Sequence, residues 1–205
     1  MATDFELLDR WGEGDKAAGE ALFERYFDAM YRFFDRKVSA DVSDLVQRTF
    51  LACVEGRARF RRDASFRTYL YGVARNEICR HWRQVRRDEA LDFSTTTLHD
   101  VDPSPSALAL KKQEDRLLLE ALRHIPLDLQ IAVELHYWEG MTGPEIASVL
   151  GIPEGTARSR LRRALEALRD RVQALASSPS QLQATMSGLD GWAARLRATS
   201  EDQEP

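Results

Sequence analysis

The sequence has few of the residues that support catalysis, disulfide scaffolds or metal sites. Its 205 residues include only two cysteines and four histidines, which is too few for a disulfide framework. Cys53 and Cys79 do not have the spacing of a metal-binding pair. Cys79 and His81 are two residues apart on an expected helix, so their side chains project in different directions. No catalytic triad, Gly-rich phosphate loop or paired-carboxylate site is recognisable. We therefore expect no enzyme activity, no metal and no cofactor.

Long apolar runs are also missing. No stretch approaches the roughly 20 apolar residues that a membrane-spanning helix requires, and the N-terminus lacks the hydrophobic region of a signal peptide. We expect a cytoplasmic protein with no membrane insertion.

The chain as a whole lacks the positive charge that is typical of DNA-binding proteins, since its net charge is −4. The charge is unevenly distributed, however. Residues 57–87 carry ten basic and two acidic side chains, and residues 154–171 carry six and three. Two basic blocks in an otherwise acidic chain are typical of two separate nucleic-acid contacts. The acidic remainder should limit indiscriminate DNA binding by the free protein.

Apolar residues at helical spacing are abundant, and they predict an all-α fold. Thr3 is expected to cap a short first helix, and Asp15 a long helix that runs to about Lys37. A third helix is expected over 41–55. Ser65 should cap a fourth helix, which runs to about Arg83.

Residues 142–163 read as a helix, a turn and a second helix. Thr142 and Glu145 form a capping-box pair, and Gly151 and Pro153 mark the turn. The second helix has one apolar side and one side of arginines and short polar residues, which suits the DNA major groove. A basic, solvated surface helix is the alternative. The expected groove side carries Thr156, Ser159, Arg160 and Arg163, with Arg162 on its flank.

The first basic block consists of the loop GRARFRRDAS at 56–65 and the far side of the following helix. On that side we expect Trp82 to be exposed beside arginines and an asparagine, an arrangement that fits contacts to phosphates and unstacked bases. The alternative is that Trp82 is a partly buried anchor and the arginines are solvated. The side is formed by Arg75, Asn76, Cys79, Trp82 and Arg83.

Composition divides the chain into four segments. Residues 1–87 form a first helical module, and the acidic, Ser/Thr/Pro-rich residues 88–112 form a flexible linker. Residues 113–172 form a second helical module. The extension 173–205 contains a further amphipathic piece to about Ala198. That piece could dock on the second module, contact a partner or be only partly ordered.

These segments, in this order, resemble the extracytoplasmic function (ECF) group of the sigma-70 family of bacterial sigma factors. DLVQRTFL at 44–51 resembles the family's polymerase-binding segment, and SFRTYLYGVARN at 65–76 resembles the segment that leads into −10 recognition and promoter melting. YWEGMT at 137–142 and EGTARSRLRRA at 154–164 resemble the module that reads the −35 element. The resemblance covers roughly residues 5–172. It implies a sigma factor that directs core RNA polymerase to −35/−10 promoters and helps to melt the −10 element.

The resemblance also assigns roles to residues. The clamp helices of core polymerase would contact Asp44, Leu45, Gln47, Arg48 and Leu51. The −10 DNA would contact Arg57, Arg59, Arg61, Arg62, Phe66, Arg75, Asn76, Arg80, Trp82 and Arg83. The −35 DNA would contact Thr156, Arg158, Ser159, Arg160, Arg162 and Arg163.

The implied partners are core polymerase, through its clamp helices and flap, and promoter DNA. An anti-sigma factor is left open as a further partner, and the protein would associate with the nucleoid when it is in holoenzyme. Arg80 and Trp82 depart from the residues that the family often has there, which leaves the −10 specificity open. Two rival functions remain. One is a helix-turn-helix regulator that acts without polymerase, and the other is an interaction protein such as an adaptor or an anti-sigma decoy.

Overall fold

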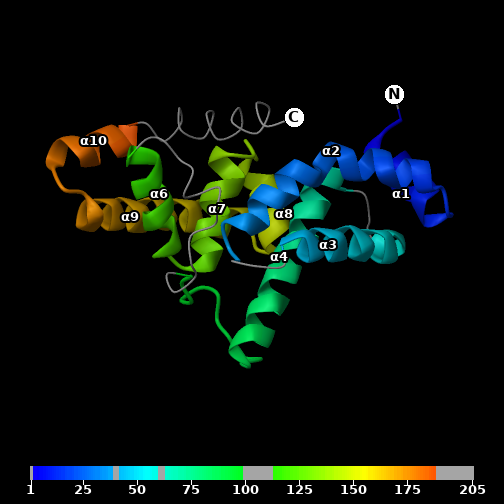
Figure 1. Ribbon diagram of the computed structural model, residues 1–205, viewed down its shortest axis with the longest axis horizontal. Helices are drawn as coiled ribbons and strands as arrows, with labels where there is room; N and C mark the ends of the chain where they lie inside the picture. Colours follow the sequence, from blue (N-terminus) through cyan, green and yellow to red (C-terminus); the bar gives the residue numbers. More distant parts are fainter. Residues whose placement is uncertain (1, 39–41, 60–62, 99–112, 188–205) are drawn as a thin grey trace. The chain divides into compact units, whose positions relative to one another are not determined.

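The structure is a computed structural model that describes residues 2–38, 42–59, 63–98 and 113–187, and the regular structure in these ranges is helical (Figure 1). The prediction of an all-α fold is confirmed. The described chain forms two compact units. The first consists of the residues up to Glu89 together with the short segment Ser148–Gly151, and the second consists of the other residues from Ala90 onward. None of the helices in these ranges is both long enough and apolar enough to cross a membrane.

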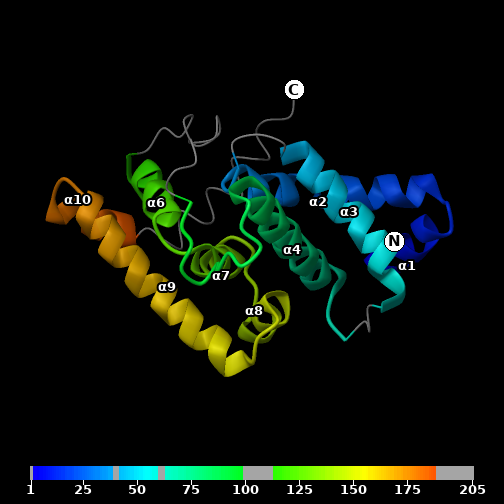
Figure 2. The same ribbon diagram turned by 90° about the horizontal axis from the view of Figure 1, so that it is seen from below.

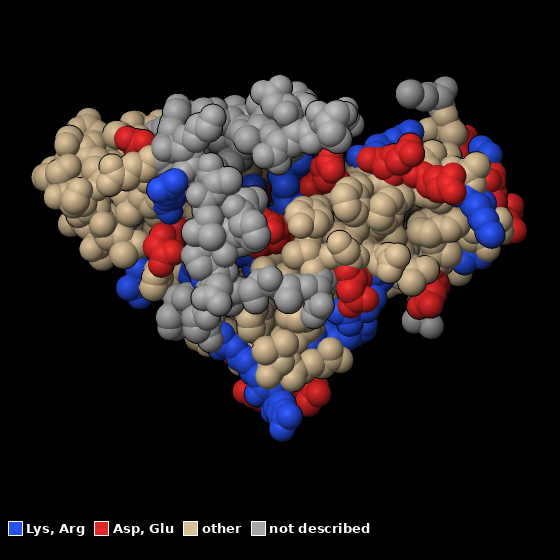
Figure 3. All heavy atoms as spheres, in the orientation of Figure 1, with Lys and Arg blue, Asp and Glu red and all other residues tan. Residues whose placement is uncertain are grey.

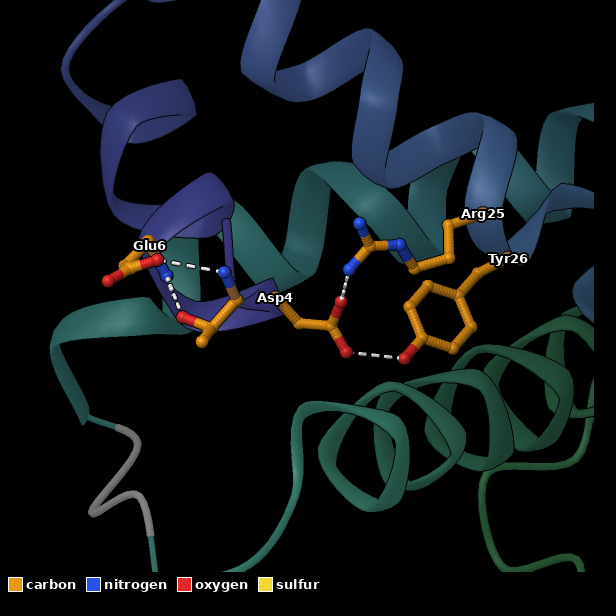
Figure 4. A network of polar contacts seen from close by, with 5 residues as sticks. Asp4, Glu6, Arg25 and Tyr26 are labelled. Carbon is orange, nitrogen blue, oxygen red and sulfur yellow. Dashed lines mark hydrogen bonds and ion pairs between the residues drawn. The ribbon is translucent and has the colours of Figure 1, made fainter. Parts of the chain in front are cut away.

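In the described ranges, the part of the chain up to Glu89 forms four α-helices and one 3-10 turn. Three of the α-helices begin at the predicted capping residues, because Thr3, Asp15 and Ser65 each accept a backbone N–H from the first turn. Thr3 and Glu6 form a complete capping box (Figure 4). The elements are α1 (Asp4–Gly12), α2 (Lys16–Asp35), α3 (Val42–Gly56), η1 (Arg57–Arg59) and α4 (Phe66–Arg86).

Aromatic rings from all four α-helices contribute to the packing of the first unit. The ring of the buried Phe50 on α3 lies with its centroid 5.0 Å from that of Phe23 on α2 and 6.4 Å from that of Trp11 on α1. Phe66, the buried first residue of α4, packs edge-on against Phe5 and Tyr26. These contacts join the helices around two buried rings.

A polar contact fastens α1 to α2 beside this core. Arg25 and Tyr26, both on α2, donate hydrogen bonds to the two carboxylate oxygens of Asp4 (Figure 4). Burial, followed by the hydrogen bond to Asp4, raises the pKa of the Tyr26 phenol above its ordinary value. The Tyr26 phenol is therefore protonated at physiological pH and can donate its hydrogen bond to Asp4.

The second unit is built on aliphatic residues. Leu118 and Leu122 on α6 pack with Leu168 and Val172 on α9 in one buried cluster, and Trp138 closes it. The elements are α6 (Gln113–Arg123), α7 (Leu127–Tyr137), α8 (Gly143–Leu150), α9 (Glu154–Leu175) and α10 (Pro179–Ser187).

Helix α10 docks on this second unit, which was one of the three possibilities for the C-terminal extension. It lies beside α6 and the C-terminal part of α9 (Figures 1 and 2). Its Leu182 and Met186 pack against the buried cluster. The rest of the amphipathic piece expected to reach Ala198 lies outside the described residues.

The prediction places the start of the linker too early in the chain, because residues 92–98 of the predicted linker 88–112 are bound to the second unit. We call this segment the strap. The Leu98 N–H donates to the Arg123 carbonyl at 3.1 Å, and the Thr96 carbonyl accepts the Leu127 N–H at 2.8 Å. The side chains of Phe93 and Leu98 are buried. Its Ser/Thr-rich sequence looked like linker because these residues serve a local turn, in which Ser94 and Thr96 bond back to Asp92. Residues 99–112 lie outside the described ranges.

Replacing Leu98 with alanine tests whether the strap belongs to the second unit. Leu98 is fully buried, so Leu98→Ala should lower the free energy of unfolding by about 2–5 kcal/mol. Leu175→Ala is the matched control, because Leu175 is 40% exposed and its loss should change stability by no more than about 0.5 kcal/mol. Urea denaturation of the full chain measures both. Equal effects of the two substitutions would show that the strap is not docked.

Candidate nucleic-acid interface

Arg57 braces the ends of two helices, although it was predicted to contact DNA. Its guanidinium donates to the Val54 carbonyl of α3 at 2.9 Å and to the Gly12 carbonyl of α1 at 3.1 Å. The last carbonyls of a helix lack intrahelical partners, and a cationic side chain there satisfies them and complements the helix dipole. Gly12 has no Cβ, which leaves room for the guanidinium. The charge of Arg57 is thus used inside the first unit, and its contact with −10 DNA stays a prediction.

The other arginines of this loop are only partly covered by the structure. Arg59 ends η1, and only its backbone is described. Arg61 and Arg62 lie outside the described residues, so their predicted contact with −10 DNA stays a prediction.

The outer side of α4 carries the polar residues expected to contact −10 DNA. Asn76 is exposed, and Arg75 and Arg83 are partly exposed. Arg80 is 61% exposed and forms an ion pair of 2.6 Å with the buried carboxylate of Glu77. Basic side chains also lie over the C-terminal end of α4, at the bottom of the view in Figure 3, with acidic side chains beside them. This side of the helix can meet a phosphate backbone.

Two aromatic residues from the predicted −10 set are buried instead. Trp82 is 7% exposed, and the Arg86 guanidinium lies 5.3 Å from the centre of its ring. The expectation of an exposed Trp82 is therefore wrong, and the alternative of a buried anchor is correct. Cys79 on the same side is buried too, and Phe66 is 2% exposed within the aromatic core. Neither Trp82 nor Phe66 presents a free ring face for a base.

The outer side of α3 presents the predicted polymerase-binding residues, with one exception. Leu51 is 54% exposed and Gln47 is exposed. Arg48 and Asp44 form an exposed i, i+4 ion pair of 3.0 Å. Leu45 is fully buried, because it lies on the inward stripe of the helix. The prediction that Leu45 contacts a partner is corrected to a core role.

An apolar hollow of about 470 Å³ borders this side of α3. Leu51 and Gln47 form part of its wall, and Lys16 and Glu20 of α2 add charged groups. A large exposed leucine at the edge of an apolar hollow is typical of a surface that receives a partner. The aromatic residues that line the hollow are Trp11, Phe23 and Phe50.

Helices α8 and α9 form the predicted helix-turn-helix. Thr142 donates to the Glu145 carboxylate at the start of α8, from its backbone N–H at 2.8 Å and from its hydroxyl at 2.7 Å. Gly151 ends α8 with a φ of 65°, in the left-handed region that glycine adopts without strain. Pro153 then precedes the first turn of α9.

The outward side of α9 carries most of the residues expected to contact −35 DNA. Thr156, Arg162 and Arg163 are exposed. Arg158 is exposed and pairs with Glu154 one turn earlier. Arg162 lies 3.9 Å from Glu166, whereas Arg163 forms no ion pair within the described part of the chain. The partly exposed Ser159 donates its hydroxyl to the Gly155 carbonyl at 2.6 Å.

Arg160 does not lie on this outward side, where it was expected, and its contact with −35 DNA stays a prediction. Its Nη1 lies 2.9 Å from Asp128 Oδ2, and the two side chains are only 14% and 8% exposed. Residue 160 follows the buried Ala157 by three positions and precedes the buried Ala164 by four, so all three share the inward side of α9. That spacing could have revealed its direction. Asp128 was not singled out from the sequence.

The raised pKa values of two side chains in the first unit follow from the packing of the fold. Burial raises the pKa of the Cys53 thiol, and burial together with the proximity of Cys53 raises the pKa of Tyr69 to about 12. Both groups are therefore neutral at physiological pH. No group of three or more His, Cys, Asp or Glu side chains in these ranges is arranged to hold a metal ion.

Comparisons with known proteins agree with this division into two units. Residues 22–88 match the family model of sigma-70 region 2, and residues 115–168 match that of sigma-70 region 4. The chain is 31% identical over 184 residues to the ECF RNA polymerase sigma-E factor of Haemophilus influenzae, covering 84% of this chain and 97% of that protein. The sigma-E factor of Escherichia coli K12 is 33% identical over 183 residues, covering 84% and 96%.

Two solved structures share the fold. One is CnrH in complex with the cytosolic domain of CnrY, with a TM-score of 0.63 and 22% identity over 84% of this chain and 99% of that one. The other is the sigma factor RpoE in complex with the anti-sigma factor NepR from Bartonella quintana, with a TM-score of 0.54 and 21% identity over 75% and 96%.

The bracing role of Arg57 can be tested by Arg57→Gln. Two hydrogen bonds from a charged donor are lost at helix ends, so the free energy of unfolding should fall by about 1–3 kcal/mol. Arg87→Gln removes an exposed arginine of the same unit and should change stability by no more than about 0.5 kcal/mol. Thermal denaturation of the full chain measures both variants. If Arg57→Gln keeps its stability and loses only DNA binding, the original prediction of a DNA contact stands instead.

Proposed function

The chain belongs to the ECF group of the sigma-70 family, and we propose how its two units divide the work of promoter recognition. As a member of this family it is a sigma factor, which directs RNA polymerase to specific promoters for transcription initiation. We assign polymerase binding and −10 recognition to the first unit and −35 recognition to the second. The observation that carries this division is the order of the region 2 and region 4 matches, each of which contains a helix with an exposed polar side.

The outer side of α3 is the proposed contact with the polymerase clamp. The apolar hollow beside Leu51 has room for a large side chain of a partner helix, because its volume of about 470 Å³ falls in the range of small-molecule pockets. Lys16, Glu20 and Gln47 add polar groups to its lining, which matches the pattern of an apolar centre and a polar rim. Asp44 and Arg48 lie on the same outer side of α3. We further propose that the polymerase flap binds the second unit.

The outer side of α4 and the loop over 59–65 are the proposed −10 contacts. Arg75, Arg80 and Arg83 recur along one side of α4 and would follow the phosphates, with Asn76 available for a base edge. Extruding a base from the duplex costs a few kcal/mol, roughly. Contacts with core polymerase and with the −35 duplex would offset this cost, so melting would occur only in holoenzyme.

The outward side of α9 is the proposed −35 reader. Arginine reads guanine in the major groove through paired hydrogen bonds, and hydroxyls contact phosphates or base edges. Arg163 is the strongest candidate for such a base contact, because it is exposed and forms no ion pair among the described residues. The other proposed contacts are Thr156, Arg158, Ser159 and Arg162.

The remaining proposals concern partners and location. RpoE of Bartonella quintana was solved with an anti-sigma factor, and we propose that an anti-sigma factor also controls this chain. We place the protein in the cytoplasm, and on the nucleoid when it is in holoenzyme, because the proposed target that it binds is promoter DNA. We propose that it has no enzyme activity and needs no cofactor.

Run-off transcription with core polymerase and a set of promoter fragments tests the function. A defined start site that depends on the added chain supports a sigma factor. A helix-turn-helix regulator would bind duplex but select no start site with core enzyme. An adaptor or decoy would bind protein and no promoter. Either of those results would overturn the proposed function.

The division of labour predicts separable defects. Arg163→Ala should weaken binding of holoenzyme to the preferred −35 duplex by roughly 5- to 150-fold, the equivalent of about 1–3 kcal/mol, and relax the preference at one base pair. Binding to core polymerase should be unchanged. Arg169→Ala is the matched control, since it removes another exposed arginine of α9 nearer the C-terminus.

The converse variant combines Asp44→Ala with Gln47→Ala. It should weaken association with core polymerase, measured by fluorescence anisotropy of the labelled chain, and leave −35 binding by the free chain intact. The same defect profile for this variant and Arg163→Ala would contradict the division.

A further inference from the structure

We propose that Arg160 and Asp128 are a positioning pair for −35 recognition, which hold α9 at a fixed rotation and do not read bases. This inference rests on the proposed function of α9 as the −35 reader. It concerns how the reading side is presented, and it assigns a role to an acidic residue of α7 that lies outside the helix-turn-helix.

The pair is a largely buried ion pair that joins two helices of the second unit. Arg160 Nη1 and Asp128 Oδ2 are 2.9 Å apart, and the exposed fractions of the two side chains are 14% and 8%. The residues are 32 positions apart in sequence and join the second turn of α9 to the first turn of α7. A guanidinium turned toward α7 cannot also reach a base on the opposite side of α9. Releasing it would remove the positive charge beside a buried carboxylate, which is strongly unfavourable.

The strap holds Asp128, the acidic member of the pair, in place. The backbone N–H of Asp128 donates to the Phe93 carbonyl at 3.1 Å, so the first turn of α7 is tied to the strap. Asp92, at the start of the strap, is a second acidic neighbour of Arg160. Hydrogen bonds from Ser94 lower the pKa of Asp92 most, and the charge of Arg160 lowers it further. The strap thus holds the backbone of Asp128 and adds a second negative charge in the neighbourhood of Arg160.

The ion pair adds a directional contact to the packing of α9 near its N-terminus. Pro153 precedes the helix without a side-chain capping bond. The fully inward positions beside Arg160 are Ala157 and Ala164, and the partly buried Leu161 between them packs against the buried cluster. Arg160 adds a bond to one defined acceptor, which apolar contacts do not provide. A rotation of α9 about its axis would move Thr156, Ser159 and Arg163 together, so the pair controls the whole reading side.

Four variants of the full chain, assembled with core polymerase, test the inference. They are Asp128→Asn, Arg160→Gln, the two combined, and the charge exchange of Asp128→Arg with Arg160→Asp. Binding is measured on duplexes that carry each single base-pair change in the −35 element, and over a range of salt concentrations. Asp170→Asn, at an exposed site on α9, is the control for the carboxylate change.

A positioning pair predicts that both single variants lose discrimination at every −35 position, by about tenfold for one displaced bidentate contact. The double variant should be no worse than either single one, because both remove the same interaction. The dependence of affinity on salt should keep its slope, since no phosphate contact is removed. The charge exchange should recover part of the discrimination, although an aspartate at position 160 cannot donate to guanine.

A base-reading Arg160 gives a different pattern. Arg160→Gln would then relax the preference at one base pair only, Asp128→Asn would keep full discrimination, and the charge exchange would be the weakest variant. That result overturns the inference. Binding to core polymerase and the melting temperature are recorded for each variant, and Arg160→Lys, which keeps the charge, replaces any variant that fails to fold. If wild-type holoenzyme shows no −35 preference, the proposed function itself fails. If it shows one that Asp128→Asn leaves intact, only the positioning role fails.

Discussion

An arginine that is already bonded inside a folded chain cannot neutralise a phosphate without giving up that bond. The constraint is strongest for an arginine that is itself largely covered. Arg80 also pairs with a buried carboxylate, but its side chain is 61% exposed, so part of its guanidinium remains open to DNA. Arg57 bonds the carbonyl ends of α1 and α3, and Arg160 bonds a buried carboxylate on α7. Both residues stabilise the units that carry the interface. The surface that can meet DNA is therefore smaller than the basic blocks suggest, and its remaining arginines project from helices that other arginines hold in place.

The two units hold the helices of the proposed DNA contacts in place in different ways. In the first unit, aromatic rings from four helices interlock around Phe50 and Phe66, and the helix that presents the proposed −10 contacts begins within that core. In the second unit the core is aliphatic and lies toward the C-terminal half of α9, where α10 covers it. The N-terminal half of α9, which carries the proposed reading side, packs inward through Ala157, Ala164 and the partly buried Leu161. The ion pair of Arg160 with Asp128 adds a directional polar contact to this apolar packing.

The sequence predicted the features that depend on local physics. Helix starts at Thr3, Asp15 and Ser65 follow from short-range capping bonds, and the turn at Gly151 follows from the φ that glycine tolerates. Features that depend on distant partners were not predictable in the same way. The bond of Arg57 to Gly12 spans 45 positions, and the docking of the strap depends on α7. Composition identifies a Ser/Thr-rich stretch as linker whether or not a distant helix binds it.

The exposed arginines of α9 differ from Arg160 in what a DNA contact would cost them. Arg158 and Arg162 are 74% and 76% exposed and pair with carboxylates one turn away. Such exposed pairs are worth only about 0–1 kcal/mol each, so a phosphate can replace the carboxylate at little cost. These pairs also reduce the net attraction of the free helix for DNA. Stable binding then requires a DNA site that offers Arg163 a matching base, together with further contacts from polymerase. This requirement favours promoter selection by holoenzyme over indiscriminate binding by the free chain.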